Sequence, residues 1–531
     1  MYKSDGTLTF YYDNDRALRT EGETDDGLMG WRNRWEDTKY VRKAIFDTSF
    51  ANYTDITSTA YLFEDCNSLV SIEGLSNLNT ENVTNMSGMF FACESLTNLD
   101  VSGLNTSNVK DMYALFIGCL NLTTLDLSHF NTSHVTNMSN MFRACEKLTE
   151  IDASHFDTGN VTDMSGMFSA CPALQQVNVS HFDTRNVIDM SGMFSDNQNL
   201  TRVDVSSFSV EKVQNIERMF AECPNLEVIT LGNVNLLSAT NLRSVFSGCT
   251  KLPVLDLSRF YTPSATDMTG MFENCSSLQI LDLSSFNTEH VTSMLDMFRG
   301  CTNLTSLDVK SFNTISVDNM CNMFRDCSSL TELDLSGFQT GNVMDMSSMF
   351  GGCSSLTSLG VSGFDTGNVT DMTSMFSCCS SLTSLDVSGF DTRNAIYLGN
   401  MFGDCSKLTS LNVNSFTISH TAGIEAMFAG CSGLTAIYCD NRWEPEYSDG
   451  MFYHCYNLAN YSSDKVTAEY AKPMTEGGYF TPTSQIPSSI EVCCHRDDIT
   501  HKQSMAYDLQ GRRIEQSRKG LYIVGRKKMA K

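Results

Sequence analysis

Cysteine recurs along most of this chain at a fixed interval, and that interval limits the possible folds more than any other feature. A series of cysteines runs from Cys93 to Cys431 in steps of 26 residues, with one double step of 52 residues that passes Asn197, and Cys321 and Cys378 lie outside this series. Cys66 and Cys455 extend the series with steps of 27 and 24 residues, which gives 16 positions, 15 of them cysteine. A period held this tightly predicts stacked repeats rather than the three or four separate domains that a length of 531 residues suggests.

Each repeat contains two apolar patterns separated by a polar turn. In one repeat, Leu125 and Leu127 alternate with polar residues, which predicts a short strand. From Val135 to Cys145, apolar residues follow at spacings of 3, 6, 7 and 10, which predicts a short helical turn. The polar residues 131–134 between them are of turn-forming types. Because one such unit cannot bury its apolar side alone, we expect the units to stack into a solenoid with one continuous core.

The repeat consensus resembles that of a known group of bacterial proteins. It is clearest in Leu333-Asp334-Leu335-Ser336-Gly337-Phe338-Gln339-Thr340-Gly341-Asn342-Val343, followed by Met346, Met349-Phe350 and Cys353. This pattern resembles a leucine-rich repeat and, more closely, the 26-residue repeat of BspA-like leucine-rich-repeat surface proteins. The resemblance implies an α/β solenoid of about 16 rungs, each a short strand plus a short helical turn. It further implies adhesion or host contact without enzymatic activity, and it transfers no binding residue.

The two ends of the chain depart from the repeat. Residues 1–40, with an expected strand over Thr7–Tyr12, are interpreted as an N-terminal cap on a solenoid of residues 41–460. Residues 461–483 are interpreted as a C-terminal cap, in which Gly477–Phe480 closes the stack. Residues 484–490 are interpreted as a linker and residues 491–531 as a tail.

The tail has a charge of its own and a second resemblance. It holds 10 Lys+Arg and 5 Asp+Glu, hence +5 in a chain of net charge −26. The segments Tyr507-Asp508-Leu509-Gln510-Gly511-Arg512 and Lys519-Gly520-Leu521-Tyr522-Ile523-Val524 resemble the C-terminal sorting domain of Bacteroidota type IX secretion. That resemblance implies a secreted or cell-surface protein that uses export machinery as a partner, with a leader that this sequence does not contain.

The net charge and the motifs of the sequence argue against several classes of function. With 36 Lys+Arg against 62 Asp+Glu, the net charge of −26 is opposite to what a nucleic-acid phosphate binder needs. The sequence contains no apolar run of about 18 residues, so no transmembrane helix is expected. It also contains no nucleophile elbow, no H-E-x-x-H and no P-loop, so we expect neither enzymatic activity nor a cofactor.

Three repeated columns could carry metal chemistry, and each has a structural alternative. The cysteine column could be a metal array or a disulfide ladder, but one cysteine per rung in an apolar register favours small buried side chains. The methionine column, which includes Met138 and Met141, could bind a soft metal but is expected in the core. His129, His155 and His181 are expected at a tolerant surface position. We therefore predict no metal site.

A column of aspartates is the candidate binding face. These residues alternate with inward-facing ones and are expected to point outward, where calcium or a basic partner could offset their repulsion. The alternative, which we favour, is that each bonds a neighbouring Ser or Thr or a turn amide, because Asn178, Thr230, Gly360 and Asn412 replace them without breaking the period. The nine residues are Asp100, Asp126, Asp152, Asp204, Asp256, Asp282, Asp308, Asp334 and Asp386.

The sequence thus predicts a secreted or cell-surface protein that binds a host or bacterial protein or glycan through an extended solenoid face. Two alternatives remain open, a non-binding structural spacer and a cytoplasmic scaffold.

Overall fold

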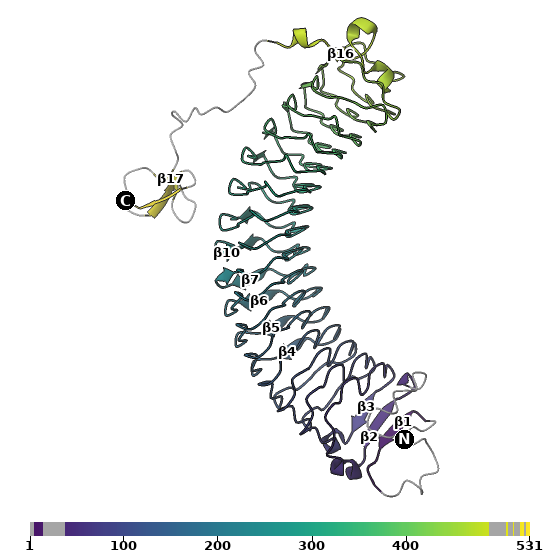
Figure 1. The fold of residues 1–531 in the computed structure, drawn as a ribbon, viewed down its shortest axis with the longest axis vertical. Coiled ribbons are helices and arrows are strands. Elements are labelled where there is room, and N and C mark those ends of the chain that lie inside the picture. Colours follow the sequence, from purple (N-terminus) through teal and green to yellow (C-terminus); the bar gives the residue numbers. More distant parts are fainter. Residues whose placement is uncertain are drawn as a thin grey trace. The chain divides into compact units, whose positions relative to one another are not determined.

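The computed structural model of the protein describes residues 5–13 and 38–487, and beyond them only four short strands between residues 506 and 530. The chain divides into two compact units, Met1–Ser484 and Gln485–Lys531. Within the first unit, parallel bridges join residues one repeat apart, turn after turn, so this unit is a solenoid, as the cysteine period predicts (Figure 1).

One side of the solenoid carries short parallel strands. In-register pairs join residues one repeat apart, as in Ile151 with Val177. Along one strand, Val203 and Val205 are buried, whereas Asp204 between them is exposed, which is the alternation of a strand with one face on the core. The strands of this side are β3 (Ser71–Glu73), β4 (Glu150–Asp152), β5 (Gln176–Asn178), β6 (Arg202–Val205), β7 (Val228–Leu231), β9 (Val254–Leu255), β11 (Ile280–Leu281), β12 (Glu332–Leu333), β13 (Ser358–Leu359), β14 (Ser410–Asn412) and β15 (Ala436–Tyr438).

The other half of each repeat is not helical, so the predicted short helical turn per rung is wrong. Residues 41–460 contain no α-helix, and the only helices there are the short 3-10 segments η3 (Thr48–Asn52) and η4 (Leu75–Asn77). Consecutive tight turns take the place of the expected helix.

The reason lies in two left-handed residues per repeat. Asn140 and Ala144 have φ angles of 56° and 59°, which a helix cannot accommodate. As a result, the backbone amides alternate between partners in the next turn and partners in their own turn. The amide of Met138 donates to the carbonyl of Asp163 in the next turn at 3.0 Å, whereas the amide of Met141 donates to the carbonyl of Met138 in its own turn at 3.2 Å. The backbone is thus satisfied partly between turns, while the apolar spacing still looks helical in sequence.

A second row of parallel bridges holds the turns together at the start of this half. It links sixteen residues, one per turn from Ser58 to Tyr447, and most of them are Asn or Asp. In the turn of Asn137, the side-chain oxygen accepts the amide of Ser139 at 2.9 Å, which fixes the first tight turn. Beside the strands, β8 (Val234–Asn235) and β10 (Phe260–Tyr261) form a further parallel pair.

A column of phenylalanine rings runs through the core. Sixteen rings, one per turn from Phe63 to Phe452, stack with centroids 5.6–5.9 Å apart and with planes within 12° of parallel. The methionine column, including Met138 and Met141, is fully buried beside it, which confirms its assignment to the core. Each turn therefore closes only against its neighbours.

The end turns are covered by additional strands. β1 (Thr7–Phe10) pairs with β2 (Lys43–Phe46), which pairs with β3, so the predicted first strand is confirmed but ends two residues before Tyr12. Trp31 and Trp35, which belong to the predicted N-terminal cap, lie outside the described residues.

At the other end, β16 (Phe480–Thr481) pairs with β15, and the ring of Phe480 lies 4.8 Å from that of Trp443. Both rings are buried, so the segment predicted to close the stack does contact its last turns. The 3-10 helices of this region are η5 (Ala468–Tyr470), η6 (Met474–Glu476) and η7 (Thr483–Gln485).

The second unit contains a small antiparallel sheet in the order β18-β17-β19-β20. Its strands are β17 (Ala506–Tyr507), β18 (Arg513–Ile514), β19 (Leu521–Val524) and β20 (Lys527–Ala530). The adjacent cysteines Cys493 and Cys494 precede them in the sequence and lie outside the described residues. Among the residues that the structure describes, no helix has the length and apolar character needed to cross a bilayer.

Candidate binding face

The nine predicted aspartates all lie in the outward positions of the strand side, one per turn. In each, Oδ1 accepts the backbone amide of the residue two positions later, at 2.9–3.2 Å. This bond turns the chain away from the strand and towards the second half of the repeat. The structural alternative, in which each aspartate bonds a turn amide, therefore holds for Oδ1 of all nine aspartates.

In six of the nine aspartates, hydrogen bonds to the carboxylate lower its pKa. Hydrogen bonds from the side chain and the backbone amide of Ser102 lower the pKa of Asp100. Asp334 also receives a hydrogen bond from Lys310, with Nζ and Oδ2 2.8 Å apart, and its pKa falls to about 2. The strand side is thus an acidic face at neutral pH, and the Oδ1 bond orients each carboxylate.

The replacements in this column show what the turn requires. The side-chain oxygens of Asn178 and Asn412 accept the same amide at 3.2 Å. An amide oxygen can therefore do the structural work, and a negative charge is not needed for it. Among the described residues, no group of three or more His, Cys, Asp or Glu side chains is arranged to hold a metal ion.

The cysteine column is buried, as predicted. Fourteen of its thiols, from Cys93 to Cys455, donate to the carbonyl of a phenylalanine in the preceding turn at 2.9–3.3 Å. Burial raises the pKa of Cys119 to about 12. All cysteines of the described region are free, and the column is therefore part of the core.

The three column histidines are exposed and do not assemble into a site. Nε2 of His155 lies 2.7 Å from the carbonyl oxygen of Leu127, and Nδ1 of His129 lies 3.2 Å from the hydroxyl of Ser128. The first contact reaches the preceding turn and the second is made to the adjacent residue, and neither joins two of the histidines.

Three exposed apolar residues on the strand side were not predicted from the sequence. Val228, Val254 and Ile280 occupy one column in consecutive turns, with Val254 paired to Ile280. Elsewhere this column is mostly polar, as at Ser306 and Ser358. Comparing each column across all turns would have revealed them, whereas the search for motifs did not.

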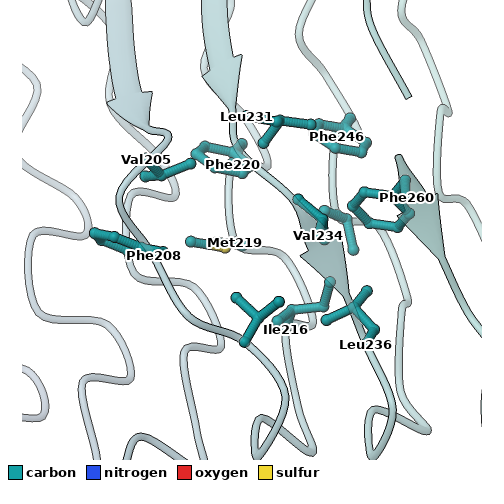
Figure 2. Close-up of a pocket in the computed structure, with 12 residues that line it drawn as sticks. Val205, Phe208, Ile216, Met219, Phe220, Leu231, Val234, Leu236, Phe246 and Phe260 are labelled. Atoms are coloured by element: carbon teal, nitrogen blue, oxygen red, sulfur yellow. The ribbon is translucent and has the colours of Figure 1, made fainter. Parts of the chain in front are cut away.

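The repeat is also altered inside the same region. Val234 stands where the preceding and following turns have Phe208 and Phe260, and a cavity of about 30 Å³ lies among these residues (Figure 2). Its lining is apolar throughout, including Met219 and Leu236. Without a polar group to orient a ligand, this space is a packing defect of the core rather than a binding pocket.

Comparison with known proteins gives one family match. A family profile described as "Mycoplasma protein of unknown function, DUF285" matches five overlapping segments, namely residues 57–154, 143–253, 240–359, 329–443 and 355–467. A search of curated proteins finds no match.

Several solved structures are similar to this chain. A leucine-rich repeat protein from Bacteroides ovatus is 18% identical with a TM-score of 0.36, over 79% of this chain and 78% of that one. One from Eubacterium ventriosum is 16% identical with a TM-score of 0.31, over 81% and 91%. The functional domain of InlJ from Listeria monocytogenes, which includes a cysteine ladder, is 18% identical with a TM-score of 0.23, over 76% and 74%.

Proposed function

This chain belongs to the DUF285 family, whose matches together span residues 57–467, and we propose that it is a secreted or cell-surface protein that binds other molecules through its strand side. The ligand is a protein or glycan on a host or bacterial surface. The proposal rests on one observation above all: aspartates whose Oδ1 is fixed by a turn amide occupy one face of the solenoid in nine of the thirteen turns from Asp100 to Asn412.

Such a face suits binding by many weak contacts. Neighbouring strands lie about 4.8 Å apart, so a ligand that spans several turns meets several carboxylates. Because Oδ1 of each aspartate is already held by a turn amide, little side-chain freedom is lost when a ligand docks. A ligand with several cationic or hydrogen-bond donor groups would gain from each added turn.

The test separates the charge of the aspartates from their structural role. Asp256, Asp282 and Asp334 are replaced together by Asn, which occurs naturally in this column at Asn178 and Asn412 and retains the acceptor. The control replaces Glu81, Glu211 and Glu289 by Gln, which removes the same charge from exposed residues of the polar turns.

The three proteins are compared on arrays of purified surface and matrix proteins and of glycans. We expect at least one ligand that binds the wild type and the Gln control, and that binds the Asn variant at least about tenfold more weakly. A wild type that binds nothing would favour the structural spacer. Binding that survives in the Asn variant would remove the aspartates from the proposal.

Export through the tail is the second part of the proposal. It is supported by the resemblance of residues 491–531 to a sorting domain. Deleting these residues is expected to abolish cleavage of the solenoid by external protease on intact cells, whereas the full chain is cleaved. If the full chain is itself protected, the protein is retained inside the cell.

A cytoplasmic scaffold is the second candidate, and one observation favours it. All described cysteines are free, which is typical of a reducing compartment. A tag inserted between residues 484 and 490 decides between the two: protection of the tagged chain in intact cells supports the scaffold, and its digestion supports surface display.

A further inference from the structure

Three consecutive turns of the strand side expose large apolar side chains. Val228, Val254 and Ile280 are 43%, 60% and 66% exposed, and they follow one another at the repeat interval on β7, β9 and β11. Val254 and Ile280 are directly paired partners. We call these three residues the apolar strip.

Folding does not require apolar residues at this position. The column is occupied mainly by polar side chains elsewhere, and the solenoid continues through those turns without change. Its polar members are Ser71, Asn98, Thr124, Glu150, Gln176, Arg202, Ser306, Glu332, Ser358, Ser384 and Ser410. Since serine serves at four of these positions in the second half of the solenoid, the strip is an addition to the repeat rather than part of its core.

Carboxylates lie beside Val254 and Ile280, whereas Val228 is paired with Arg202 in the preceding turn. Asp256 and Asp282 follow Val254 and Ile280 by two residues and therefore face the same side of the strands. At the same outward position, Asp204 lies one turn before the strip and Asp308 one turn after it, while Thr230 occupies this position in the turn of Val228. The pKa values of Asp204 and Asp256 are lowered by hydrogen bonds from Ser206 and Ser258, respectively.

We propose that the apolar strip is a docking site for a polypeptide segment that presents apolar side chains flanked by Lys or Arg. This inference rests on the proposed function and specifies its partner class. The apolar side chains of the partner cover Val228, Val254 and Ile280, and its cations meet the surrounding carboxylates.

Charge and size select this occupant over a second copy. If two copies joined strip to strip in a symmetric pair, Asp256 and Asp282 of one would face those of the other, and like charges would meet. Three side chains also fall far short of the roughly 800 Å² that each partner buries in a typical stable complex. Any partner must therefore extend over the acidic surface around the strip, which favours a cationic one.

The test uses the full chain and three synthetic peptides of equal length, with alternating Leu and Lys, alternating Ser and Lys, and alternating Leu and Glu. The strip variant carries Val228→Ser, Val254→Ser and Ile280→Ser, each a residue that the same column holds in other turns. The control variant carries Val70→Ser and Ile396→Ser, which are 54% and 47% exposed outside the strip.

Binding is measured by fluorescence anisotropy at physiological salt. We expect the Leu–Lys peptide to bind the wild type at least about tenfold more tightly than either other peptide. We also expect the strip variant to lose at least about tenfold in affinity for it, while the control variant keeps the wild-type value. Thermal melting of both variants checks that they are folded. If the triple variant does not fold, the single variant Ile280→Thr replaces it, and we expect a smaller loss of affinity for the Leu–Lys peptide.

Other results would overturn the inference. Equal affinity of the strip and control variants, or Ser–Lys binding as tight as Leu–Lys, would show that charge alone attracts the peptide. A wild type that dimerises through the strip, with a monomeric strip variant, would replace the partner by a second copy. An array ligand that is lost on changing the aspartates to Asn but kept in the strip variant would leave the proposed function standing and refute the strip.

Discussion

At the scale of the residue, Asn197 shows how the core accepts a polar substitution. It stands in the cysteine series and is completely buried. Its Nδ2 donates to the carbonyls of Phe168 and Phe194 at 2.9 and 2.7 Å, and its Oδ1 accepts the amide of Cys171 at 2.9 Å. The amide thus reproduces the thiol's bond to the preceding turn and adds two more.

Replacing Asn197 by Ala should therefore destabilise the solenoid strongly. The change removes the partners of the Phe168 carbonyl and the Cys171 amide in a dry core, and an unsatisfied buried group costs about 1–3 kcal/mol. We expect a loss of about 3 kcal/mol in the free energy of unfolding, measured by urea denaturation. Asn197→Cys should cost less, because a thiol makes this bond in the other turns. Equal stability of the wild type and the Ala variant would contradict the account.

The burial of the cysteines predicts their reactivity. Burial raises the pKa of Cys119 and Cys301 to about 12, so alkylation should stay slow in the native protein even at alkaline pH. Only Cys378 is exposed among the described cysteines, and Cys321 is partly buried.

We expect iodoacetamide at pH 8 to label Cys378 first and Cys321 more slowly, with the column labelled only after unfolding, as read by peptide mass spectrometry. The chain used carries Cys493→Ser and Cys494→Ser, since these residues lie outside the described region. Column labelling at the rate of Cys378 would contradict the buried core.

Residue burial was largely predictable, whereas individual roles were not. Membership in the Cys, Met and Phe columns followed from the period alone. By contrast, the sequence contains no sign of the three bonds of Asn197, because they depend on which backbone groups its turn brings close.

At the scale of the element, the strand was predicted correctly and the helix was not. Apolar alternation with period two is specific to strands, and the inward and outward positions of β6 agree with it. Apolar residues spaced by three and seven positions fit a helix and also fit a series of consecutive tight turns. Only the backbone φ angles distinguish these two structures. The small or polar residues at the left-handed positions, such as Asn140 and Ala144, were the one available hint.

The left-handed φ angle of Ala144 allows a direct test of the consecutive tight turns in the second half of the repeat. Glycine occupies the same place in other turns, for example Gly118 and Gly248, also with positive φ. We expect Ala144→Gly to raise the free energy of unfolding by about 0.5 kcal/mol, because relief of the left-handed strain exceeds the added chain entropy. Ala144→Val should lower it by about 1 kcal/mol, since β-branching worsens the strain. A helix at this position would reverse the order, with Gly destabilising.

At the scale of the whole molecule, the solenoid is an array in which each turn closes only against its neighbours. Phenylalanine rings, cysteine thiols and parallel bridges all repeat from turn to turn. The sequence predicted this array because its period is uninterrupted. The sequence carries less information on the outward positions, including the aspartate column and the apolar strip, because stacking constrains the inward positions and not the outward ones.

The claim that interchangeable 26-residue turns build the molecule can be tested by comparing the thermal melting of two deletions, followed by circular dichroism. Removing residues 328–353 takes out one complete turn and joins Cys327 to Ser354 in register. Removing residues 328–340 takes out half a turn and shifts every later column. We predict that the first deletion retains the wild-type spectrum per residue and a melting temperature close to that of the wild type, whereas the second loses both. A first deletion that melts as low as the second would contradict the account.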